Sequence, residues 1–290
     1  MRLWVGCLAL SVALSQSAPE LTVSVHARTV QPGAVVQLDV SCTCKASGRP
    51  ATARVFDREI PLIPVRDGAW SGLIGIDLAT AAGTYPIQIA VESAEPKPLT
   101  ATHPLAVTAR RFPTRRLTVA PVYVEPPAAE VERIAADTAR LDALYKTTTG
   151  QSLPGQFESP IAAPPQDTFG ARSIFNGQPR SPHAGTDFRA ATGTRIVAPA
   201  GGRVVLADDL FFTGRTVVID HGLGLISVLA HMSKIAVHVG DAVQRGDVVG
   251  AVGATGRATG PHLHWSVRLN GARVDPMSLI EVLGVPGVRQ

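Results

Sequence analysis

Two short motifs in the C-terminal part of the chain carry residue types that bind transition metals. His183 and Asp187 are four residues apart, and the small residues between them let a loop turn both side chains toward one point. His262 and His264 are two residues apart, so on a β-strand their side chains project from the same face. Two imidazoles and a carboxylate suit a catalytic zinc ion, which keeps its fourth position for water. Because Ca²⁺ and Mg²⁺ prefer sites made of oxygen, the motifs predict zinc.

A glycine-rich segment, residues 253–260, immediately precedes the second motif. We expect it to form a tight loop that brings the strand with His262 and His264 to the metal and leaves room for a thin peptide. The segment lacks the Lys-Ser/Thr ending of a nucleotide-binding P-loop, and no strand–helix–strand pattern surrounds it. The sequence therefore argues against phosphate binding at this loop.

The order of these motifs resembles that of the lysostaphin-type (LytM) zinc metallopeptidases, which cut peptide bonds in bacterial peptidoglycan. The resemblance covers residues 169–279, and the motifs are highly specific when taken together. The matching segments are, in chain order, His183 to Asp187, VIDHG at 218–222, LAHMS at 229–233, VGDAVQRG at 239–246 and GATGRATGPHLH at 253–264.

The resemblance also implies a role for each chemical group of the site. It makes His183, Asp187 and His264 the ligands of one zinc ion per chain, and His231 and His262 the catalytic histidines that do not bind the metal. Zinc lowers the pKa of water toward neutrality and polarises the scissile carbonyl. One histidine then takes the water proton and passes it to the leaving amine, while the other stabilises the oxyanion. The sequence assigns these two tasks to the pair jointly.

One departure from the family pattern keeps other functions open. Leu229 stands where family members often have an aromatic residue, two positions before the central histidine. A non-catalytic wall-binding regulator of other cell-wall hydrolases is therefore the alternative, but such relatives typically lack a ligand, and all five residues are present here. A lipoyl-like carrier would explain the glycine turns of residues 239–246, yet Lys234 is the only lysine of the domain and lies at no hairpin tip.

The region that holds these motifs, residues 151–290, reads as a glycine-rich antiparallel β domain. Short strand-forming runs alternate with glycine turns, and six of the eight histidines fall here. We expect Trp265 to face the core, because it follows His264 on the opposite face of its strand. We expect His221 and His238 to be structural or exposed.

The preceding residues, 19–110, show β-branched runs separated by Pro-Gly and Asp-Gly turns, which predicts an immunoglobulin-like β-sandwich. No candidate site lies in it. Cys42 and Cys44 have no further cysteine with which to complete a four-sulfur zinc site, so we interpret them as structural or weakly bridged.

A linker, residues 111–150, joins the two domains. Four arginines lie around its start: Arg110, Arg111, Arg115 and Arg116. We interpret them as a solvent-exposed face rather than as a contact with wall polymer. An apolar stripe from Val131 to Tyr145, with acidic residues in its first turn and Gly150 after its end, predicts one helix that packs against a domain. The predicted fold class is therefore all-β with one linker helix.

The composition limits the classes of partner that the protein could bind, and the first residues indicate its cellular compartment. The chain has 290 residues, of which 45% are hydrophobic and 17% charged, as in ordinary globular proteins. Its net charge of +4 comes from evenly spread basic residues, which argues against nucleic acid and is compatible with an anionic polymer, a membrane surface or the cell wall as partner. The family resemblance implies peptidoglycan. Residues 1–18 read as a signal peptide whose apolar run is too short to span a bilayer. We expect an exported protein without stable membrane insertion, in the periplasm or outside the cell.

Overall fold

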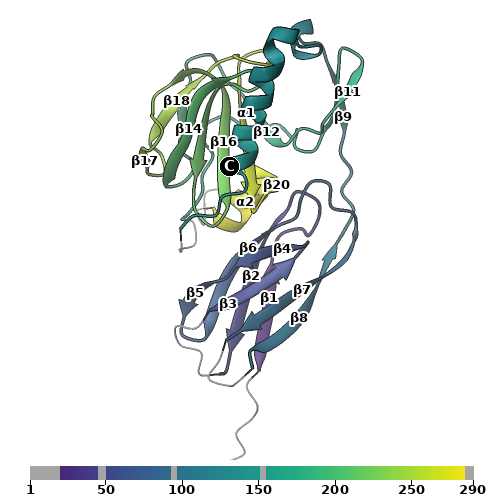
Figure 1. Cartoon of the computed structure of the whole chain (residues 1–290), viewed down its shortest axis with the longest axis vertical. Coiled ribbons are helices and arrows are strands. Elements are labelled where there is room, and N and C mark those ends of the chain that lie inside the picture. Colours follow the sequence, from purple (N-terminus) through teal and green to yellow (C-terminus); the bar gives the residue numbers. More distant parts are fainter. Residues whose placement is uncertain (1–19, 45–49, 93–96, 151–154, 285–290) are drawn as a thin grey trace, which may run out of the picture.

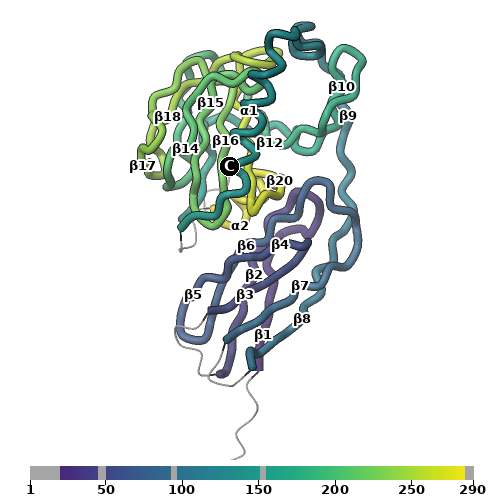
Figure 2. Tube along the Cα trace, viewed as in Figure 1, coloured from purple at the N-terminus to yellow at the C-terminus, as the bar shows by residue number. Residues whose placement is uncertain are grey.

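The computed structural model describes residues 20–44, 50–92, 97–150 and 155–284. It shows two β-rich modules placed end to end, with the linker running past the C-terminal one (Figure 1). The Cα trace follows the chain from the first module through the linker into the second (Figure 2). The predicted signal peptide lies outside the described residues. Within those residues, no helix is long and apolar enough to cross a membrane.

The N-terminal module is a sandwich of two four-stranded antiparallel sheets. Its strands are β1 (Leu21–His26), β2 (Val35–Cys42), β3 (Ala51–Val55), β4 (Arg58–Pro61), β5 (Ile63–Arg66), β6 (Ala69–Gly75), β7 (Gly83–Val91) and β8 (Leu99–Val107). The sheet orders are β1-β2-β6-β5 and β4-β3-β7-β8. Leu38 and Ile74 of the first sheet pack with Ile60 and Ile89 of the second in one apolar core. The predicted sandwich is confirmed. Cys42 and Cys44, at the end of β2, form a disulfide.

The C-terminal module is built on a nine-stranded antiparallel sheet. Strands β12-β19-β16-β15-β14-β17 form its main path, and β13, β18 and β20 pair beside it. A separate hairpin, β10-β11, precedes it. Trp265 and Phe188 are fully buried in its core, which confirms the prediction for Trp265. The strands are β10 (Arg172–Phe175), β11 (Gln178–Arg180), β12 (Gly185–Arg189), β13 (Arg195–Val197), β14 (Gly202–Leu210), β15 (Gly214–Asp220), β16 (Leu225–Ile235), β17 (Ala242–Val243), β18 (Val248–Val252), β19 (His262–Leu269) and β20 (Ala272–Val274).

The linker contributes a helix and a strand to the C-terminal module. Its elements are β9 (Thr114–Leu117), the 3-10 turns η1 (Pro121–Tyr123) and η2 (Ala128–Glu130), and α1 (Val131–Leu144). Leu141 and Leu144 of the predicted helix pack against Leu206 and Val218 of the sheet. Strand β9, which the sequence does not predict, pairs in parallel with β10. The linker is therefore part of the second module's structure.

The arginine cluster of the linker is not a uniformly solvated face. Arg111 and Arg116 are exposed, as expected. Arg110 Nη2 instead lies 3.1 Å from Asp275 Oδ2, and Arg115 Nη1 lies 3.0 Å from Asp187 Oδ2. Because both carboxylates are buried, the prediction is wrong for Arg110 and Arg115.

A second α-helix, α2 (Pro276–Leu283), adds to the single helix that the sequence predicts. Asp275 caps it by accepting a hydrogen bond from the backbone N–H of Met277 at 3.1 Å, and Pro276 occupies its first turn. The helix has eight residues and is apolar on most of its circumference, so it lacks the polar stripe that marks a longer surface helix. Leu279, at its centre, is fully buried.

The two modules share a core and several polar contacts. Val35 and Leu73 of the sandwich belong to the apolar cluster of the C-terminal module. The backbone N–H of Val35 donates to Ser278 Oγ at 2.9 Å. Arg273 binds the carboxylate of Asp77 through its backbone N–H, its Nε and its Nη2, at 2.9, 3.1 and 2.6 Å. The sandwich is therefore docked on the second module rather than tethered to it.

The contact between Asp77 and Arg273 predicts acid sensitivity of this docking. Burial alone would raise the pKa of Asp77, but hydrogen bonds from Arg273 and from the backbone of Ala79 outweigh it and lower the pKa to about 2. The stabilisation is therefore present above the unfolded pKa of 3.8 and is lost as the pH falls toward 2. We expect Asp77→Asn to cost about 2 kcal/mol of unfolding free energy at pH 7 and almost nothing at pH 2. Denaturant titrations of both proteins at the two pH values check this, and an equal loss at both would contradict it.

Candidate active site

The pairing of β12 with β19 brings the two predicted metal motifs together. In this antiparallel ladder Asp187 lies directly opposite His264, and the loop before β12 carries His183. Buried and half-buried residues alternate along β19, so His262 and His264 share one face while Trp265 enters the core. The structure thus places the side chains of both motifs at one edge of the sheet.

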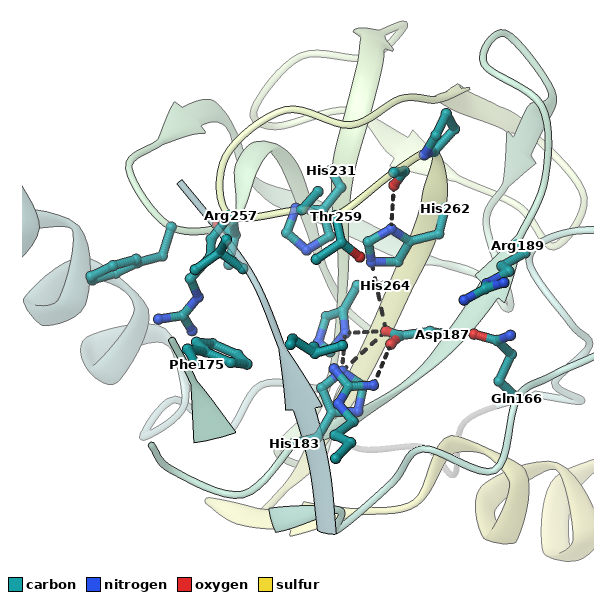
Figure 3. A pocket seen from close by; sticks show the side chains of 18 residues that line it. Gln166, Phe175, His183, Asp187, Arg189, His231, Arg257, Thr259, His262 and His264 are labelled. Carbon is teal, nitrogen blue, oxygen red and sulfur yellow. Dashed lines mark hydrogen bonds and ion pairs between the residues drawn. The ribbon is translucent and has the colours of Figure 1, made fainter. Parts of the chain in front are cut away.

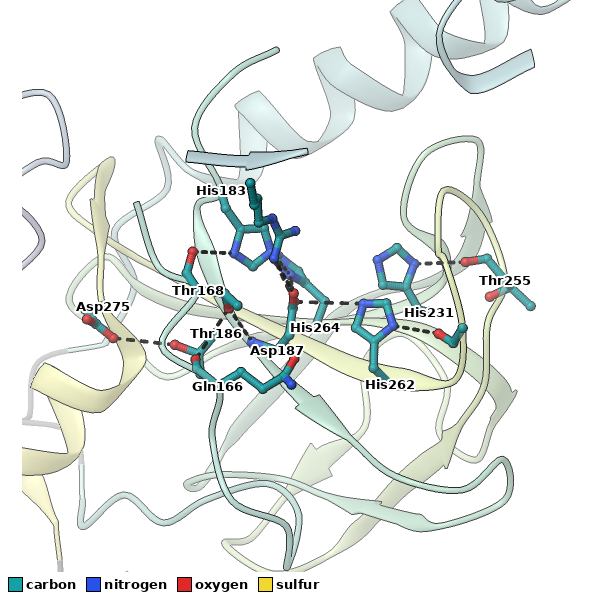
Figure 4. Close-up of polar contacts among 12 residues, drawn as sticks. Gln166, Thr168, His183, Thr186, Asp187, His231, Thr255, His262, His264 and Asp275 are labelled. Carbon is teal, nitrogen blue, oxygen red and sulfur yellow. Dashed lines mark hydrogen bonds and ion pairs between the residues drawn. The ribbon is translucent and has the colours of Figure 1, made fainter. Parts of the chain in front are cut away.

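The three predicted ligands form a compact triangle of donor atoms (Figure 4). His183 Nε2 lies 3.0 Å from His264 Nδ1 and 3.0 Å from Asp187 Oδ1, and His264 Nδ1 lies 2.9 Å from the same oxygen. Among the described residues, these three form a group of metal-binding side chains whose ligand atoms lie close enough together to hold one ion. A tetrahedral zinc with bonds of about 2.0–2.1 Å separates its ligand atoms by about 3.3 Å. The triangle is close to that size.

The proton positions of His183 support metal binding. Its Nδ1 lies 3.0 Å from the carbonyl oxygen of Thr168, which can only accept a hydrogen bond. In its neutral form the ring therefore carries its proton on Nδ1 and directs the lone pair of Nε2 toward Asp187 and His264. Three electron-rich atoms within 3.0 Å of one another share at most one proton, from His264. A bound cation would satisfy all three.

Electrostatics favours the metal-binding protonation states of Asp187 and His264. Burial opposes the charge of Asp187, but hydrogen bonds and positive charge from His183 and His264 outweigh it and hold the pKa of the carboxyl well below its usual range. Burial, aided by the charges of His183 and His262, lowers the pKa of His264 to about 4 against the opposing effect of Asp187. An ionised carboxylate and a neutral imidazole are the forms that coordinate a metal.

The two histidines assigned to catalysis lie beside this triangle. The ring centroids of His231 and His262 are 4.8 Å apart, and His262 Nε2 is 3.9 Å from Asp187 Oδ1. Each ring donates through Nδ1 to a backbone carbonyl at 2.8 Å, His231 to Thr255 and His262 to Gly260. With Nδ1 committed to a carbonyl, each ring in its neutral form therefore keeps the lone pair of Nε2 for other chemistry.

The backbone at His231 is unusual and its ring is strongly shielded. Its φ of +63° lies in the left-handed region, which a non-glycine residue adopts at a cost and which is often found at functional sites. Burial, together with the charges of His264 and His262, lowers the pKa of His231 to about 3. The ring is therefore neutral at physiological pH, as a general base must be.

These side chains line an open cavity of about 450 Å³. Figure 3 shows His231, His262, His264 and Asp187 on one side of it and Arg257 with Phe175 on the other. The guanidinium of Arg257 stacks between Phe175 and Phe212, 4.8 and 4.7 Å from the ring centroids. The cavity is thus lined by three residues that could bind a metal and by two imidazoles that could accept a proton. Hydrolysis of a polarised carbonyl requires both kinds of group.

Glycines let the backbone approach closely at two points of the site. A Cβ on Gly185 would lie 2.5 Å from the carbonyl oxygen of Trp265 and 2.7–2.8 Å from the His264 ring, so only glycine fits behind this ligand. Gly256, at φ +68°, packs against the backbone of Phe212 and Gly214, where a side chain would collide. The predicted tight loop over residues 253–260 is confirmed.

The remaining histidines of the module lie outside this centre. His221 is buried, with Nδ1 at 2.8 Å from the carbonyl of Gly201 and Nε2 at 2.9 Å from Ser227 Oγ, and burial lowers its pKa to about 4. The side chain of His238 is 92% exposed. Both fit the structural or exposed roles that the sequence predicts.

Sequence reasoning missed Arg115, Thr168 and Thr255, which hold the functional side chains. Thr168 and Thr255 act through backbone carbonyls, which no side-chain pattern reveals. Arg115 belongs to the noted arginine cluster, but only the pairing of β9 with β10 shows that it reaches Asp187.

Comparison with known proteins assigns a family to the part of the chain that carries these residues. The profile of Peptidase family M23 matches residues 181–276, which include all five predicted site residues. A crystal structure from Pseudomonas aeruginosa assigned to peptidase M23 superposes with a TM-score of 0.66 and 33% identity, covering 88% of this chain and 96% of that one. The chain belongs to peptidase family M23. The likeness to this M23 structure extends over both modules, because it covers most of either chain.

Curated relatives match about a third of this chain. Peptidoglycan DD-endopeptidase ShyA of Vibrio cholerae is 41% identical over 97 residues, which are 33% of this chain and 23% of ShyA. DD-carboxypeptidase/endopeptidase Mpg of Neisseria meningitidis is 40% identical over 97 residues, 33% of this chain and 22% of Mpg. The match thus spans less than a quarter of the length of these relatives.

Proposed function

We propose that this M23 protein is a zinc metalloendopeptidase that hydrolyses peptide bonds in the stem peptides or cross-links of bacterial peptidoglycan. The observation that carries the proposal is the triangle of His183, Asp187 and His264, with two further imidazoles beside it in an open cavity. The names of the relatives ShyA and Mpg support peptidoglycan as the substrate.

The residues of the site divide the work of hydrolysis. His183, Asp187 and His264 would hold the zinc, which when bound supplies Lewis acidity to the scissile carbonyl and to the attacking water. The Nε2 lone pairs of His231 and His262 are free to accept a proton from water. One of these imidazoles would accept the water proton at Nε2 and pass it to the leaving amine. The other would donate a hydrogen bond to the oxyanion only when it carries a second proton, on Nε2, because its Nδ1–H is bound to a backbone carbonyl.

We further propose that the protein is exported and acts in the periplasm or outside the cell. The signal-like residues 1–18 and the location of peptidoglycan outside the cytoplasm support this. Peptidoglycan is the partner that this proposal requires.

One of the observations that favoured a non-catalytic regulator, the presence of Leu229, does not support it in the structure. Leu229 is fully buried in the apolar core and does not line the cavity. Its difference from the aromatic residue of other family members therefore changes no contact within the site.

Metal removal tests the proposed activity directly. Purified protein is expected to contain about one zinc per chain and to release soluble muropeptides from sacculi, because its donor set matches a catalytic zinc site. A chelator should abolish release, and added zinc should restore it. Elemental analysis paired with chromatography of the digest gives both readouts. Bound zinc without any muropeptide release would instead support the wall-binding regulator.

A further inference from the structure

The linker delivers a charged side chain to the metal-ligand carboxylate. Asp187 uses Oδ1 toward both histidine nitrogens, at 3.0 Å from His183 and 2.9 Å from His264. Its second oxygen, Oδ2, lies 3.0 Å from Nη1 of Arg115. The two oxygens therefore have separate partners, one facing the ligand triangle and one facing the linker.

The pair formed by Arg115 and Asp187 is shielded from solvent. The side chains are 24% and 7% exposed, respectively. Nε of Arg115 is buried and has no hydrogen-bond partner among the described residues. Burying a guanidinium while leaving one of its donors unused costs free energy, and the contact with Asp187 is the interaction that offsets this cost.

Contacts that do not involve Asp187 fix the linker before Arg115. The ring of Phe112 packs edge-on against Phe169 and lies over Gly170, where a Cβ would collide with it. The backbone N–H of Arg172 donates to the carbonyl of Pro113 at 2.8 Å. The chain thus enters β9 in a fixed position.

The linker is fixed equally well after Arg115. The side chain of Asn176 accepts a hydrogen bond from Val119 N–H and donates one to the Val119 carbonyl, each at 3.0 Å. Between these two anchors the parallel ladder pairs Arg115 with Ser173. Arg115 is therefore held at the carboxylate by the fold of the linker.

We propose that Arg115 is a positioning residue that sets the orientation of the metal ligand Asp187. The metal centre is then completed by a strand outside residues 181–276, the segment that matches family M23. The inference rests on the proposed function, because it requires Asp187 to bind zinc. Arg116, the next residue of the strand, is exposed and cannot take this role.

A physical reason for such a residue lies in the coordination that hydrolysis needs. A catalytic zinc keeps one position open, and a carboxylate free to rotate can occupy that position with its second oxygen. By holding Oδ2, Arg115 leaves only Oδ1 for the ligand triangle. Partners of this kind typically affect metal affinity or activity by about 10- to 100-fold.

An inhibitory strap is the competing explanation for the same contacts. Arg115 and Leu117 of β9 line the cavity, and the strand passes the His183–Asp187 pair in Figure 3. If the strand served to block the site, loss of the Arg115 contact would raise activity. A positioning role predicts the opposite sign, so the two explanations are separable.

The test compares full-length wild type with Arg115→Ala, Arg115→Lys and the matched control Arg116→Ala. Zinc dissociation constants come from competition with a chromogenic chelator, and kcat and KM come from a soluble cross-linked muropeptide. We expect Arg115→Ala to weaken zinc binding and lower kcat by about 10-fold or more each, with KM nearly unchanged. Arg115→Lys should recover part of both losses, and Arg116→Ala should match wild type.

Each outcome bears on a different claim. Wild-type zinc affinity in Arg115→Ala, or turnover above wild type, would overturn the positioning role while leaving the proposed function intact. A wild type that binds no zinc would overturn the proposed function and this inference with it. Thermal melting of each variant separates an unfolded protein from a mispositioned ligand. If the alanine variant does not fold, Arg115→Met, which keeps the length of the side chain but not its charge, carries the comparison, and unchanged zinc affinity and kcat in it would overturn the role.

Discussion

Substitution of His264 by alanine is expected to abolish zinc binding and activity together. Nδ1 of this residue contacts both other donor atoms, His183 Nε2 at 3.0 Å and Asp187 Oδ1 at 2.9 Å, so its loss leaves two ligands for an ion that needs three. Lewis-acid stabilisation is worth several kcal/mol, so kcat/KM should fall by at least about 1000-fold. Elemental analysis for zinc and the rate of muropeptide release measure the two effects on one protein sample.

His238→Ala is the matched control for this experiment. It removes an imidazole from the same module, but the side chain is 92% exposed and its only ion-pair partner is Asp241, at 3.8 Å, within the described residues. We expect zinc content and activity equal to wild type. A His264→Ala protein that still carries one zinc per chain would show that the triangle is not the metal site.

The candidate metal site could be predicted from the sequence to the extent that it depends on local periodicity. Alternation along a strand puts His262 and His264 on one face and Trp265 on the other, and the structure has this arrangement. The meeting of His264 with Asp187 depends instead on the register of two strands far apart in the chain. Spacing alone could not supply that register; the resemblance to a known family did.

The linker strand shows why other contacts escaped prediction. Residues 114–117, TRRL, have no apolar alternation of their own, and the strand exists because it pairs with β10, which is more than fifty residues away. Arg115 and Arg116 are indistinguishable by type, yet one contacts Asp187 and the other faces solvent. Such a difference arises from tertiary pairing, which is absent from the local pattern.

The position of Leu229 differs from what strand alternation predicts because of the backbone conformation at His231. A residue two positions before His231 on a regular strand would share its face and so approach the substrate. His231 instead adopts a left-handed conformation, with φ of +63°. The alternation is interrupted there, so His231 reaches the cavity while Leu229 stays in the core. The sequence gives no sign of this change in backbone conformation.

Substitution of His231 by alanine is expected to remove turnover while leaving the metal in place. The ring packs edge-on against that of His264, with centroids 5.9 Å apart, and its Nδ1 is bound to the Thr255 carbonyl. Among the described residues, no hydrogen bond or ion pair joins it to a donor atom of the ligand triangle. Loss of a general acid or base typically lowers the rate by about 100- to 10,000-fold. Zinc content should stay at the wild-type level and KM should change little, which elemental analysis and steady-state kinetics on a cross-linked muropeptide will show.

His262→Ala and the double variant with His231→Ala extend this prediction to the pair. If the two imidazoles act in one proton-transfer step, the double variant should be little slower than the slower single variant, because groups that act as a unit are not additive. If one histidine moves the proton and the other independently stabilises the oxyanion, the two losses should multiply. Loss of zinc in His231→Ala to the extent seen in His264→Ala would contradict the division of ligands from catalytic histidines. The rates and the zinc content together therefore decide how the four imidazoles share the reaction.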